Sequence, residues 1–452
     1  MDLSKQYRYL PDTEKDQKQM MEKLQIDSID ELFADIPTSV RQKAPTAIVD
    51  GMSELELTRH LKKLANQNLS SEEAAFFLGA GTYDHFIPSV VDHVISRSEF
   101  TTAYTPYQPE ASQGELQALF EFQSMICELT GMEVSNSSLY DGFTSLGEAA
   151  NLATSVKKRA KVLYSAVLHP QAKEVLQTYA FGMEYKAEEV AHKDSFTDLE
   201  KLEEQLDDQT AAVIIQYPNF LGSVEDLREI KRLCDQTQTL LIVISNPLSL
   251  GILEAPGKLG ADIVVGDMQP LGIPMNFGGP HCGYFTVNKK HMRKVPGRIV
   301  GETVDAEGKR GYVMTLQTRE QHIRREKATS NMSSNQALMA LSSAVTMTAL
   351  GKKGIKEMAM QNIQKAHQLA QKLEEKGWEI YNSPAFFNEF VVQLKQPVDA
   401  VNKKLLAGNI IGGLDVSNIT GKPNSMLLCV TEKRSKEEIN QLIEALEVAD
   451  ND

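Results

Sequence analysis

Residues 211–245 read AAVIIQYPNFLGSVEDLREIKRLCDQTQTLLIVIS, and the order of elements within them indicates the fold class. Two apolar runs, Ala211–Gln216 and Leu240–Ser245, have the composition of buried strands, and Val224–Gln236 between them has the pattern of a helix. Near-continuous apolar strands that alternate with helices are typical of a mostly parallel sheet covered on both faces. We therefore predict an α/β protein.

The same alternation continues on both sides of this stretch. Candidate strands are Val134–Leu139, Lys161–Ser165, a short one near Glu184, Asp262–Val265 and Gly283–Val287, and candidate helices are Gly114–Gly131, 145–160, Pro170–Tyr179 and Asp198–Leu206. Residues 67–330 are therefore predicted to form one large α/β domain. In such a domain, ligands bind at the carboxyl ends of the strands.

Helical segments flank this domain. Residues 1–66 read as an N-terminal helical arm with helices over Glu14–Leu24 and near Ser28 and Glu54, and its apolar stripe must be buried on its own domain or on a partner subunit. Residues 331–452 read as two long linking helices followed by a small α+β C-terminal domain. The sequence leaves open which surface covers the arm.

Composition excludes several classes of protein. The 452 residues carry a net charge of -14, which argues against nucleic acid or an anionic membrane as the main partner. The N-terminus is polar, and no apolar run approaches the roughly 20 residues of a membrane span. The cysteines are scattered without a CxxC pair, and the histidines show no metal-ligand spacing. We expect a cytoplasmic protein with reduced, mostly buried thiols and no metal.

The loop TAYTPYQPEAS, residues 102–112, is the first candidate for a functional site. Pro106 and Pro109 exclude a helix through it, so we predict an extended, rigid loop. It would present six polar side chains, those of Tyr104, Thr105, Tyr107, Gln108, Glu110 and Ser112. The alternative is a wall packed under a domain, with the tyrosine hydroxyls merely satisfied.

Basic side chains are concentrated between residues 294 and 327. The candidates for contacts to an anion are Arg298, Arg319, His322, Arg324 and Arg325. They could anchor an anionic group or a partner's carboxylates, or they could form an ordinary solvated helix face.

Four long motifs carry a resemblance to a known family. They are FLGAGTYDHFIPSVV (77–91), TAYTPYQPEASQGELQALFEFQSMICELTGM (102–132), GDMQPLGIPMNFGGPHCGYF (266–285) and PGRIVGETVDAEGKRGYVMTLQTREQHIRREKATSN (296–331). Together they resemble the P protein of the glycine cleavage system, glycine dehydrogenase (decarboxylating), from Tyr9-Leu10-Pro11 to the C-terminal domain. The length is similar to the N-terminal half, which some bacteria make as a separate subunit 1.

The resemblance implies a fold, a reaction and partners. The fold is that of pyridoxal-phosphate-dependent transferases of the aspartate aminotransferase type, fold type I. The reaction is glycine decarboxylation with transfer of the aminomethyl group to the lipoyl group of H protein. The implied partners are glycine dehydrogenase subunit 2, in a heterotetramer of two copies of each subunit, and lipoylated H protein.

The family's cofactor chemistry needs a lysine and an acid that this chain lacks. By position, Gln269 stands where the catalytic half of the family has its Schiff-base lysine, and Lys258, Lys289 and Lys290 do not replace it easily. The strand before it ends in Asn246, not in the acid that would hold the pyridine nitrogen protonated. We therefore predict that subunit 2 holds the pyridoxal phosphate covalently and that this chain walls the shared site and the path of the lipoyl arm.

A second element of the cofactor site is present in the sequence. The turn at Gly142, Thr144 and Ser145 opens a helix whose amides would favour phosphate, and in this half we interpret it as a vestigial phosphate turn or as an ordinary helix cap. Two other functions stay open at this point. One is a non-catalytic scaffold, and the other is a self-sufficient pyridoxal-phosphate enzyme that uses a different lysine.

Overall fold

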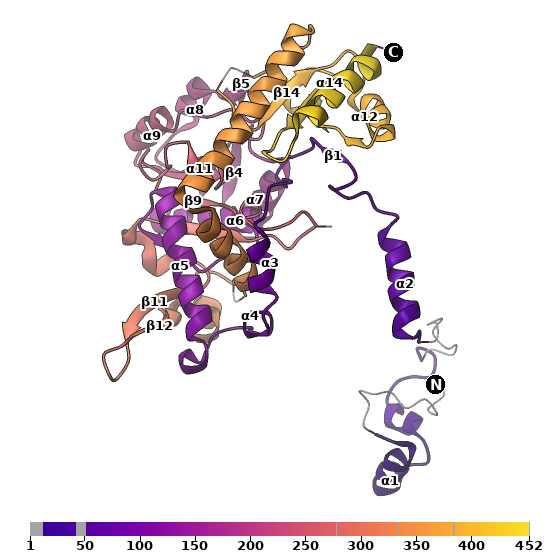
Figure 1. The fold of residues 1–452 in the computed structure, drawn as a ribbon. Coiled ribbons are helices and arrows are strands. Elements are labelled where there is room, and N and C mark those ends of the chain that lie inside the picture. Colours follow the sequence, from indigo (N-terminus) through magenta and orange to yellow (C-terminus); the bar gives the residue numbers. More distant parts are fainter. Residues whose placement is uncertain (1–11, 42–50, 277, 333, 383–384, 452) are drawn as a thin grey trace. The chain divides into compact units, whose positions relative to one another are not determined.

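A computed structural model describes residues 12–41, 51–276, 278–332, 334–382 and 385–451. The motif residues Tyr9 to Pro11 lie outside these described residues. The chain falls into two compact units, residues 1–68 and 69–452 (Figure 1). No helix among the described residues is both long enough and apolar enough to cross a membrane.

A mostly parallel sheet forms the centre of the larger unit, as the apolar runs predict. Within the described part of the chain it has seven strands, in the order β2 (Val134–Ser135), β10 (Gly283–Val287), β9 (Ile263–Asp267), β8 (Leu240–Ser245), β7 (Thr210–Tyr217), β3 (Lys161–Ser165) and β4 (Lys186–Val190). The five strands from β9 to β4 are parallel, and β10 pairs antiparallel with both of its neighbours. Every residue of β8 is buried, which explains its continuous apolar sequence.

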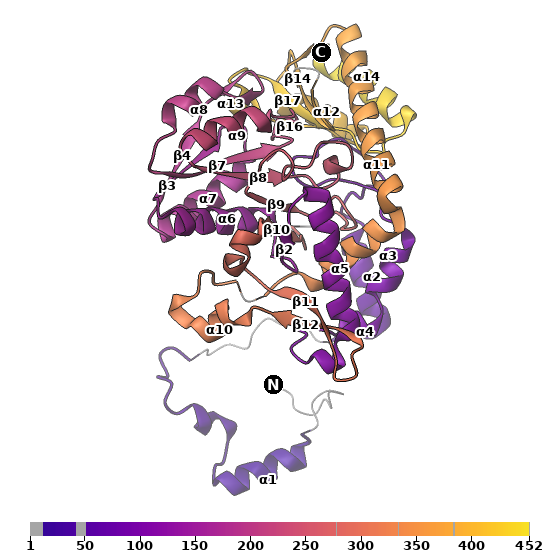
Figure 2. The same cartoon turned by 90° about the vertical axis from the view of Figure 1, so that its left-hand side faces the viewer.

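Helices cover both faces of this sheet (Figure 2). One face packs against α6 (Gly142–Lys157) and α7 (Pro170–Gly182). The other packs against α5 (Gln113–Thr130), α8 (Leu199–Gln205), α9 (Leu227–Gln236) and the first half of α11 (Ala337–Glu375). The start of α6 lies at the carboxyl edge of the sheet, directly beside the ends of β9 and β10.

A hairpin follows the sheet and was not predicted. Strands β11 (Ile299–Val304) and β12 (Arg310–Thr315) pair antiparallel within the segment that reads as charged and glycine-rich. Within β12 only Tyr312 and Met314 are buried, and Val313 between them is apolar too, so the strand shows neither a continuous apolar run nor a clean apolar/polar alternation. Three short helical turns follow, η5 (Gln317–Arg319), α10 (Gln321–Arg324) and η6 (Arg325–Lys327).

Both predicted linking helices are present, and they form the two halves of α11. They are separated at Gly351, where the backbone is not helical, with a φ of 59° and a ψ of 179°. The second half of α11 packs on a sheet that has four strands over the described residues, in the order β13 (Glu379–Ile380), β14 (Glu389–Gln393), β17 (Ser425–Cys429) and β16 (Leu414–Asp415). This sheet and helices α12 (Val398–Ala407) and α14 (Lys436–Asn451) form the C-terminal α+β region.

The segment between the arm and α5 carries the glycines of the first motif. Strand β1 (Ala75–Phe76) pairs with β15 (Ile410–Ile411), and the chain then continues through Gly79 and Gly81 to α3 (Ser89–Ile95) and α4 (Ser98–Thr101). A Cβ at Gly79 would lie 2.3 Å from the Cβ of Cys429, so only glycine allows this approach.

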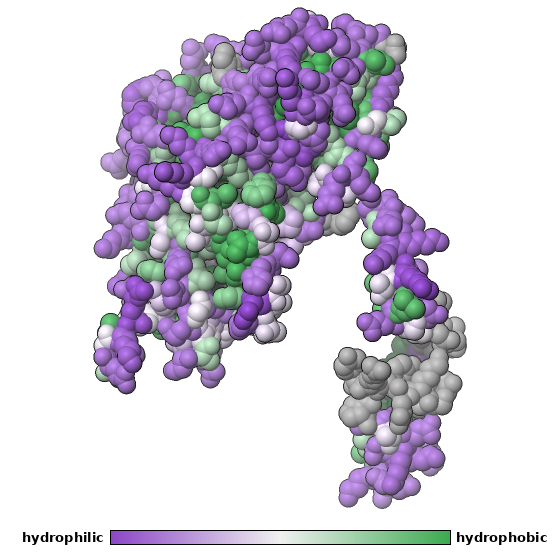
Figure 3. Space-filling view, in the orientation of Figure 1, coloured by the Kyte–Doolittle hydropathy of each residue, from purple (hydrophilic) through white to green (hydrophobic). Residues whose placement is uncertain are grey.

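The smaller unit contains α1 (Glu14–Leu24), the 3₁₀ helix η1 (Ile29–Phe33) and α2 (Glu54–Ala65), which are capped by the side chains of Thr13, Ser28 and Ser53. None of the described residues of these helices is buried. Apolar side chains of α2 therefore lie at the surface, and Figure 3 shows hydrophobic patches on this helix among polar ones. Such a stripe is typical of a surface that another polypeptide covers.

Candidate active-site cavity and the neighbouring loop

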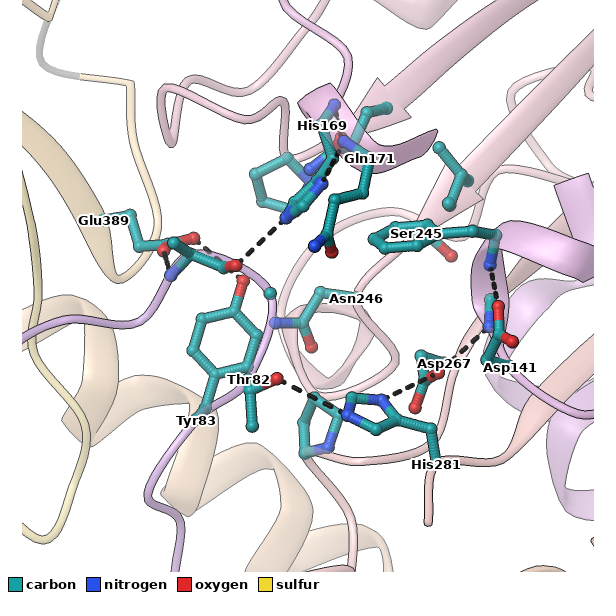
Figure 4. A pocket seen from close by; sticks show the side chains of 18 of the residues that line it. Thr82, Tyr83, Asp141, His169, Gln171, Ser245, Asn246, Asp267, His281 and Glu389 are labelled. Atoms are coloured by element: carbon teal, nitrogen blue, oxygen red, sulfur yellow. Dashed lines mark hydrogen bonds and ion pairs between the residues drawn. The ribbon is translucent and has the colours of Figure 1, made fainter. Parts of the chain in front are cut away.

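A cavity of about 610 Å³ lies at the carboxyl ends of β7, β8 and β9, where ligands bind in folds of this class. Figure 4 shows the labelled side chains around it, with Asp141, Asp267 and His281 toward one side and Glu389 and Tyr83 toward the other. None of the described residues that line it is lysine or arginine.

Gln269 follows β9 and is 1% exposed. Its side-chain oxygen accepts a hydrogen bond from the Tyr83 backbone N–H at 2.8 Å, and its Nε2 donates to the backbone oxygens of Tyr83 at 2.8 Å and Ile273 at 3.0 Å. The amide therefore uses both of its donors and its acceptor inside the chain. It fixes the strand end to the motif segment and carries no amine that could react.

Asn246 follows β8 and lines the cavity. Its Oδ1 accepts a hydrogen bond from the Leu248 backbone N–H at 3.0 Å. Beside it, the hydroxyls of Ser245 and Tyr284 lie 2.6 Å apart. The end of this strand thus holds a neutral amide and two hydroxyls, and none of these three groups is a carboxylate that could pair with a protonated ring nitrogen.

Two carboxylates accept hydrogen bonds from the backbone amides at the start of α6. Asp141 accepts hydrogen bonds from the N–H groups of Phe143 at 2.8 Å and Thr144 at 2.9 Å. Asp267, at the end of β9, accepts one from Gly142 N–H at 3.0 Å. The hydroxyl of Ser145 donates to the Asp141 backbone oxygen at 2.8 Å. The helix start therefore has the geometry of an ordinary Asp141 cap, with its first three amides bonded to carboxylates, and a phosphate role of Gly142, Thr144 and Ser145 stays a prediction.

His281 holds the outer side of the Asp267 carboxylate. The Nδ1 of His281 lies 3.1 Å from Asp267 Oδ2, and its Nε2 lies 3.5 Å from the Thr82 hydroxyl. The hydrogen bond to Asp267 raises the pKa of His281 above its usual value, although burial opposes this. The imidazole is therefore more readily protonated here than in water.

Glu389 closes the opposite side of the cavity. It accepts hydrogen bonds from the Ala80 backbone N–H at 2.7 Å and the Tyr83 hydroxyl at 2.9 Å. Burial raises the pKa of Glu389 to about 7, with both hydrogen bonds acting in the opposite direction. This carboxyl ties the motif segment to the C-terminal sheet.

His169 forms part of the cavity wall between two phenylalanines. Its ring lies 4.7 Å from the ring centroids of both Phe143 and Phe220. Its Nδ1 accepts from the Gln171 N–H at 3.1 Å, so Nε2 donates to the Ala80 oxygen at 3.0 Å and the ring is neutral. Burial lowers the pKa of His169, in agreement with that state.

The predicted loop lies outside the residues that line the cavity. Tyr104 is 79% exposed, with its hydroxyl 3.4 Å from that of Ser334, and Tyr107 is 56% exposed. Residues Pro109–Ala111 form a 3₁₀ turn, with Gln108 and Glu110 exposed at the surface. Gln113 fixes the loop to Tyr312 of the hairpin through two hydrogen bonds of 2.9 Å. The loop is thus a supported surface that presents its tyrosines outward.

The structure brings Arg298 against this loop. The guanidinium lies over the Tyr107 ring at 5.6 Å from its centroid, and Nη2 donates to the Tyr107 hydroxyl at 3.4 Å. Nη1 donates to Asn335 at 3.3 Å, and Nε is buried without a partner among the described residues. Arg298 is 7% exposed, and no described carboxylate lies within ion-pair distance of it, while the partly buried carboxyl of Glu115 interacts with its charge from further away. Its charge is therefore only partly compensated.

The other predicted basic residues lie apart from this pair. Arg319 donates through both terminal nitrogens to the backbone oxygens of Val295 and Gly297, and its Nε has no partner among the described residues. Arg324 and Arg325 are exposed, and His322 lies 3.5 Å from Glu320. A role of these residues in anion contacts stays a prediction.

Sequence reasoning did not identify five residues around the cavity, which are Tyr83, His169, Asp267, His281 and Glu389. Asp267 carried a usable signal, because a polar residue directly after a buried strand lies at the ligand-binding edge of a parallel sheet. Glu389 and Tyr83 are 306 residues apart, so their contact carried no such signal.

Comparisons with known proteins agree with this geometry. Residues 7–446 match the family described as glycine cleavage system P-protein. A protein of Bacillus cereus (strain ATCC 10987 / NRS 248), named probable glycine dehydrogenase (decarboxylating) subunit 1, is 58% identical over 438 residues, which cover 97% of this chain and 98% of that protein.

Solved structures give the same result. A crystal structure of glycine decarboxylase (P-protein) of the glycine cleavage system, in inhibitor-bound form, has a TM-score of 0.90 and 40% identity, covering 98% of this chain and 100% of that one. Glutamate decarboxylase of Lactobacillus brevis has a TM-score of 0.70 at 12% identity, covering 91% and 96%, a likeness of fold alone. The predicted fold class, fold type I, is confirmed.

Proposed function

The chain belongs to the glycine cleavage system P-protein family, and from this premise we propose that it is one half of a glycine decarboxylase whose reacting amine lies on a partner subunit. The predicted family and enzyme class are confirmed, and the class is glycine dehydrogenase (decarboxylating), EC 1.4.4.2. The name of the curated relatives, subunit 1, implies a partner subunit. The division of labour between the two subunits is the proposal.

Gln269 is the observation that carries the proposal. A glutamine amide cannot form the imine link that holds pyridoxal phosphate, and here its three hydrogen bonds to Tyr83 and Ile273 hold it buried in the chain. None of the described lining residues is a lysine. Lys290 lies instead 3.3 Å from Asp262, in an ion pair at the other end of the strands.

Two further features support placing the cofactor on the partner. The amide of Asn246 provides no charge that would keep a pyridine nitrogen protonated. The amides that would bind the phosphate already bond to Asp141 and Asp267. The residues of this cavity therefore do not fit pyridoxal phosphate, and no chemical step is assigned to it.

We place the contribution of this chain to catalysis at the loop of residues 102–112. Tyr104, Thr105, Tyr107, Gln108, Glu110 and Ser112 form the proposed wall of the shared site. Behind it, the buried and only partly compensated Arg298 would complete its bonds with an anion, either the carboxylate of glycine or the phosphate held by the partner. The wall would also guide the lipoyl arm of H protein, which accepts the aminomethyl group after carbon dioxide is lost.

Exposed apolar side chains support the proposal that this chain assembles with a partner subunit. In the larger unit, Phe86 just before α3 and Val90 within α3 are half-exposed, and in the smaller unit the apolar stripe of α2 is at the surface. We propose that subunit 2 covers these surfaces in a heterotetramer of two copies of each chain, in the cytoplasm.

Mixing the purified subunits tests the proposal. We expect this chain alone to catalyse no glycine-dependent exchange of carbon dioxide, and the mixture with subunit 2 to catalyse it. Borohydride reduction with pyridoxal phosphate should label a lysine of subunit 2 only. Exchange by this chain alone, or a labelled lysine in it, would favour a self-sufficient enzyme.

A scaffold without a role in the chemistry is the remaining alternative. In that case, substitution of Tyr107 or Glu110 would leave the rate of the assembled enzyme unchanged. The buried guanidinium of Arg298 argues against it, because no described carboxylate lies within ion-pair distance of it, whereas the buried Arg434 pairs with Asp84 and Glu438.

A further inference from the structure

The cavity of this chain contains its own anion at the place where the cofactor's phosphate binds in a fold of this class. Gly142 and Phe143 at the start of α6 line the cavity, and a helix start of this kind favours negative charge. Asp141 satisfies two of the first three amides of α6 as an ordinary cap. The third, Gly142 N–H, is satisfied by Asp267, which lies 125 residues further along the chain.

Asp267 is fixed from several directions. Its Oδ2 receives Gly142 N–H at 3.0 Å and His281 Nδ1 at 3.1 Å, and its Oδ1 receives Gln269 N–H at 2.9 Å. The helix start also packs tightly on the strand end, since a Cβ at Gly142 would lie 3.0 Å from the Asp267 backbone nitrogen. No space for a phosphate group therefore remains between this carboxylate and the amide.

We propose that Asp267 replaces the cofactor phosphate, so that it holds the start of α6 in place and closes this end of the cavity to phosphorylated ligands. The inference rests on the proposed function, in which this chain does not hold the cofactor. It adds a physical reason why this chain does not hold the cofactor. A phosphate dianion would meet two carboxylates at the place where other proteins of this fold offer it free amides. The inference also predicts that removal of Asp267 uncovers a phosphate site.

Rescue of thermal stability by an anion tests the proposal. The full-length chain and its Asp267→Ala variant are melted in inorganic phosphate and in sodium chloride of matched ionic strength. We expect the variant to melt about 2–4 °C below the wild type in chloride, because Gly142 N–H and His281 lose their partner. Phosphate should restore at least half of that shift, in a saturable way, and should not change the wild type.

Asp226→Ala is the matched control. Asp226 caps α9 through the N–H groups of Arg228 and Glu229, each at 3.1 Å, and does not line the cavity. Loss of the Asp226 cap should also lower the melting temperature, but phosphate should not restore the melting temperature. Only at α6 does the helix start lie in a cavity, with His281 beside it. Equal rescue of both variants would mean a general salt effect and would overturn the proposal.

Asp267→Asn keeps the test decisive if the alanine variant does not fold. The asparagine retains the shape of the side chain but removes its charge, so phosphate should bind to it more weakly than to the alanine variant and still more tightly than to the wild type. Phosphorus NMR line broadening measures this binding directly. No broadening with either variant, or equal broadening with the wild type, would overturn the proposal. Neither result depends on whether subunit 2 carries the catalytic lysine.

Discussion

Two regions of the molecule differ in how many of their polar groups have hydrogen-bond partners within the chain. One is the cavity, and the other is formed by Arg298 and the loop of residues 102–112, here called the Arg298 surface. At the cavity, Asp267 accepts hydrogen bonds from four neighbours, and the buried Gln269 nearby uses its whole amide. Arg298 is buried too but makes only two long hydrogen bonds, and its Nε has no partner among the described residues. A buried charge with little compensation is costly, so the second region is the one that gains from an external anion.

This difference separates a structural region from a binding region. A site whose donors and acceptors are all used gains little from a ligand, because binding would have to break those bonds first. Substitutions in the cavity should therefore change the stability of this chain. Substitutions at the Arg298 surface should change the activity of the assembled enzyme.

Gln269→Leu should give the largest effect on stability. The leucine fills similar space but leaves the Tyr83 N–H and two backbone oxygens without a partner, at a cost of about 1–3 kcal/mol each where they stay buried. We expect a loss of about 3–5 kcal/mol in the free energy of unfolding, measured from urea transitions.

Gln117→Leu is the control for that experiment, because Gln117 bonds only to exposed Glu121 on the same helix. It should change the free energy of unfolding by less than about 0.5 kcal/mol. If Gln269→Leu were as mild as this control, the cavity would not be a satisfied structural region and the comparison would fail.

Arg298→Gln should give the largest effect on activity. If the guanidinium binds an anion in the assembled enzyme, its loss should lower kcat/KM for glycine roughly 100-fold, as expected for a buried charge pair that loses one partner. The melting temperature of the chain alone should stay the same or rise, since an unpaired buried charge is removed. A higher KM would indicate the glycine carboxylate, and weaker retention of pyridoxal phosphate would indicate its phosphate.

Arg319→Gln is the matched substitution in the same segment, and we expect it to change stability and not activity. Arg319 donates to the backbone oxygens of Val295 and Gly297, so its substitution should lower stability and leave kcat/KM of the folded enzyme close to that of the wild type. If both arginine variants lost activity equally, or both lost stability equally, the proposed difference between Arg298 and Arg319 would be wrong.

Tyr107→Phe should have a smaller effect of the same kind. The ring would still lie against the Arg298 guanidinium, but the hydroxyl that accepts its Nη2 would be gone. We expect kcat/KM of the assembled enzyme to fall about 10-fold, the value of one hydrogen bond to a charged group. Tyr104→Phe should have a weaker effect, because the Tyr104 hydroxyl contacts only that of Ser334. A larger effect of Tyr104→Phe than of Tyr107→Phe would place the anion site nearer to Tyr104.

The sheet could be predicted from the sequence because burial on both faces leaves a local signal. The predicted limits Leu240–Ser245 and Gly283–Val287 are those of β8 and β10, and every residue of both strands is buried. The hairpin of β11 and β12 was missed because one of its faces is exposed, so charged residues and glycines interrupt the apolar pattern.

The site could be predicted only in part, because its contacts join residues that are distant in the chain. Arg298 and Tyr107 were each chosen for their chemistry, but nothing in the sequence indicates that they meet across 191 residues. Asp267 was overlooked because its role depends on Gly142, on a helix that begins 125 residues earlier. Residue type identifies candidates, and only the fold brings them together.

His281→Asn should give the smallest effect, and its pH dependence makes it informative. Asp267 raises the pKa of His281 in the folded chain, so protonated His281 stabilises the fold. This contribution is complete below the unfolded pKa of about 6.5 and is lost as the pH rises through the higher folded value. Relative to the wild type, the variant should be less stable by at most about 1 kcal/mol at pH 5.5, because the pair is partly exposed, and by less at pH 8.5. His322→Asn, at an exposed histidine 3.5 Å from Glu320, is the surface control and should change the free energy of unfolding by less than about 0.5 kcal/mol. A deficit for His281→Asn that is equal at both pH values would mean that shape, and not charge, holds Asp267 in the cavity.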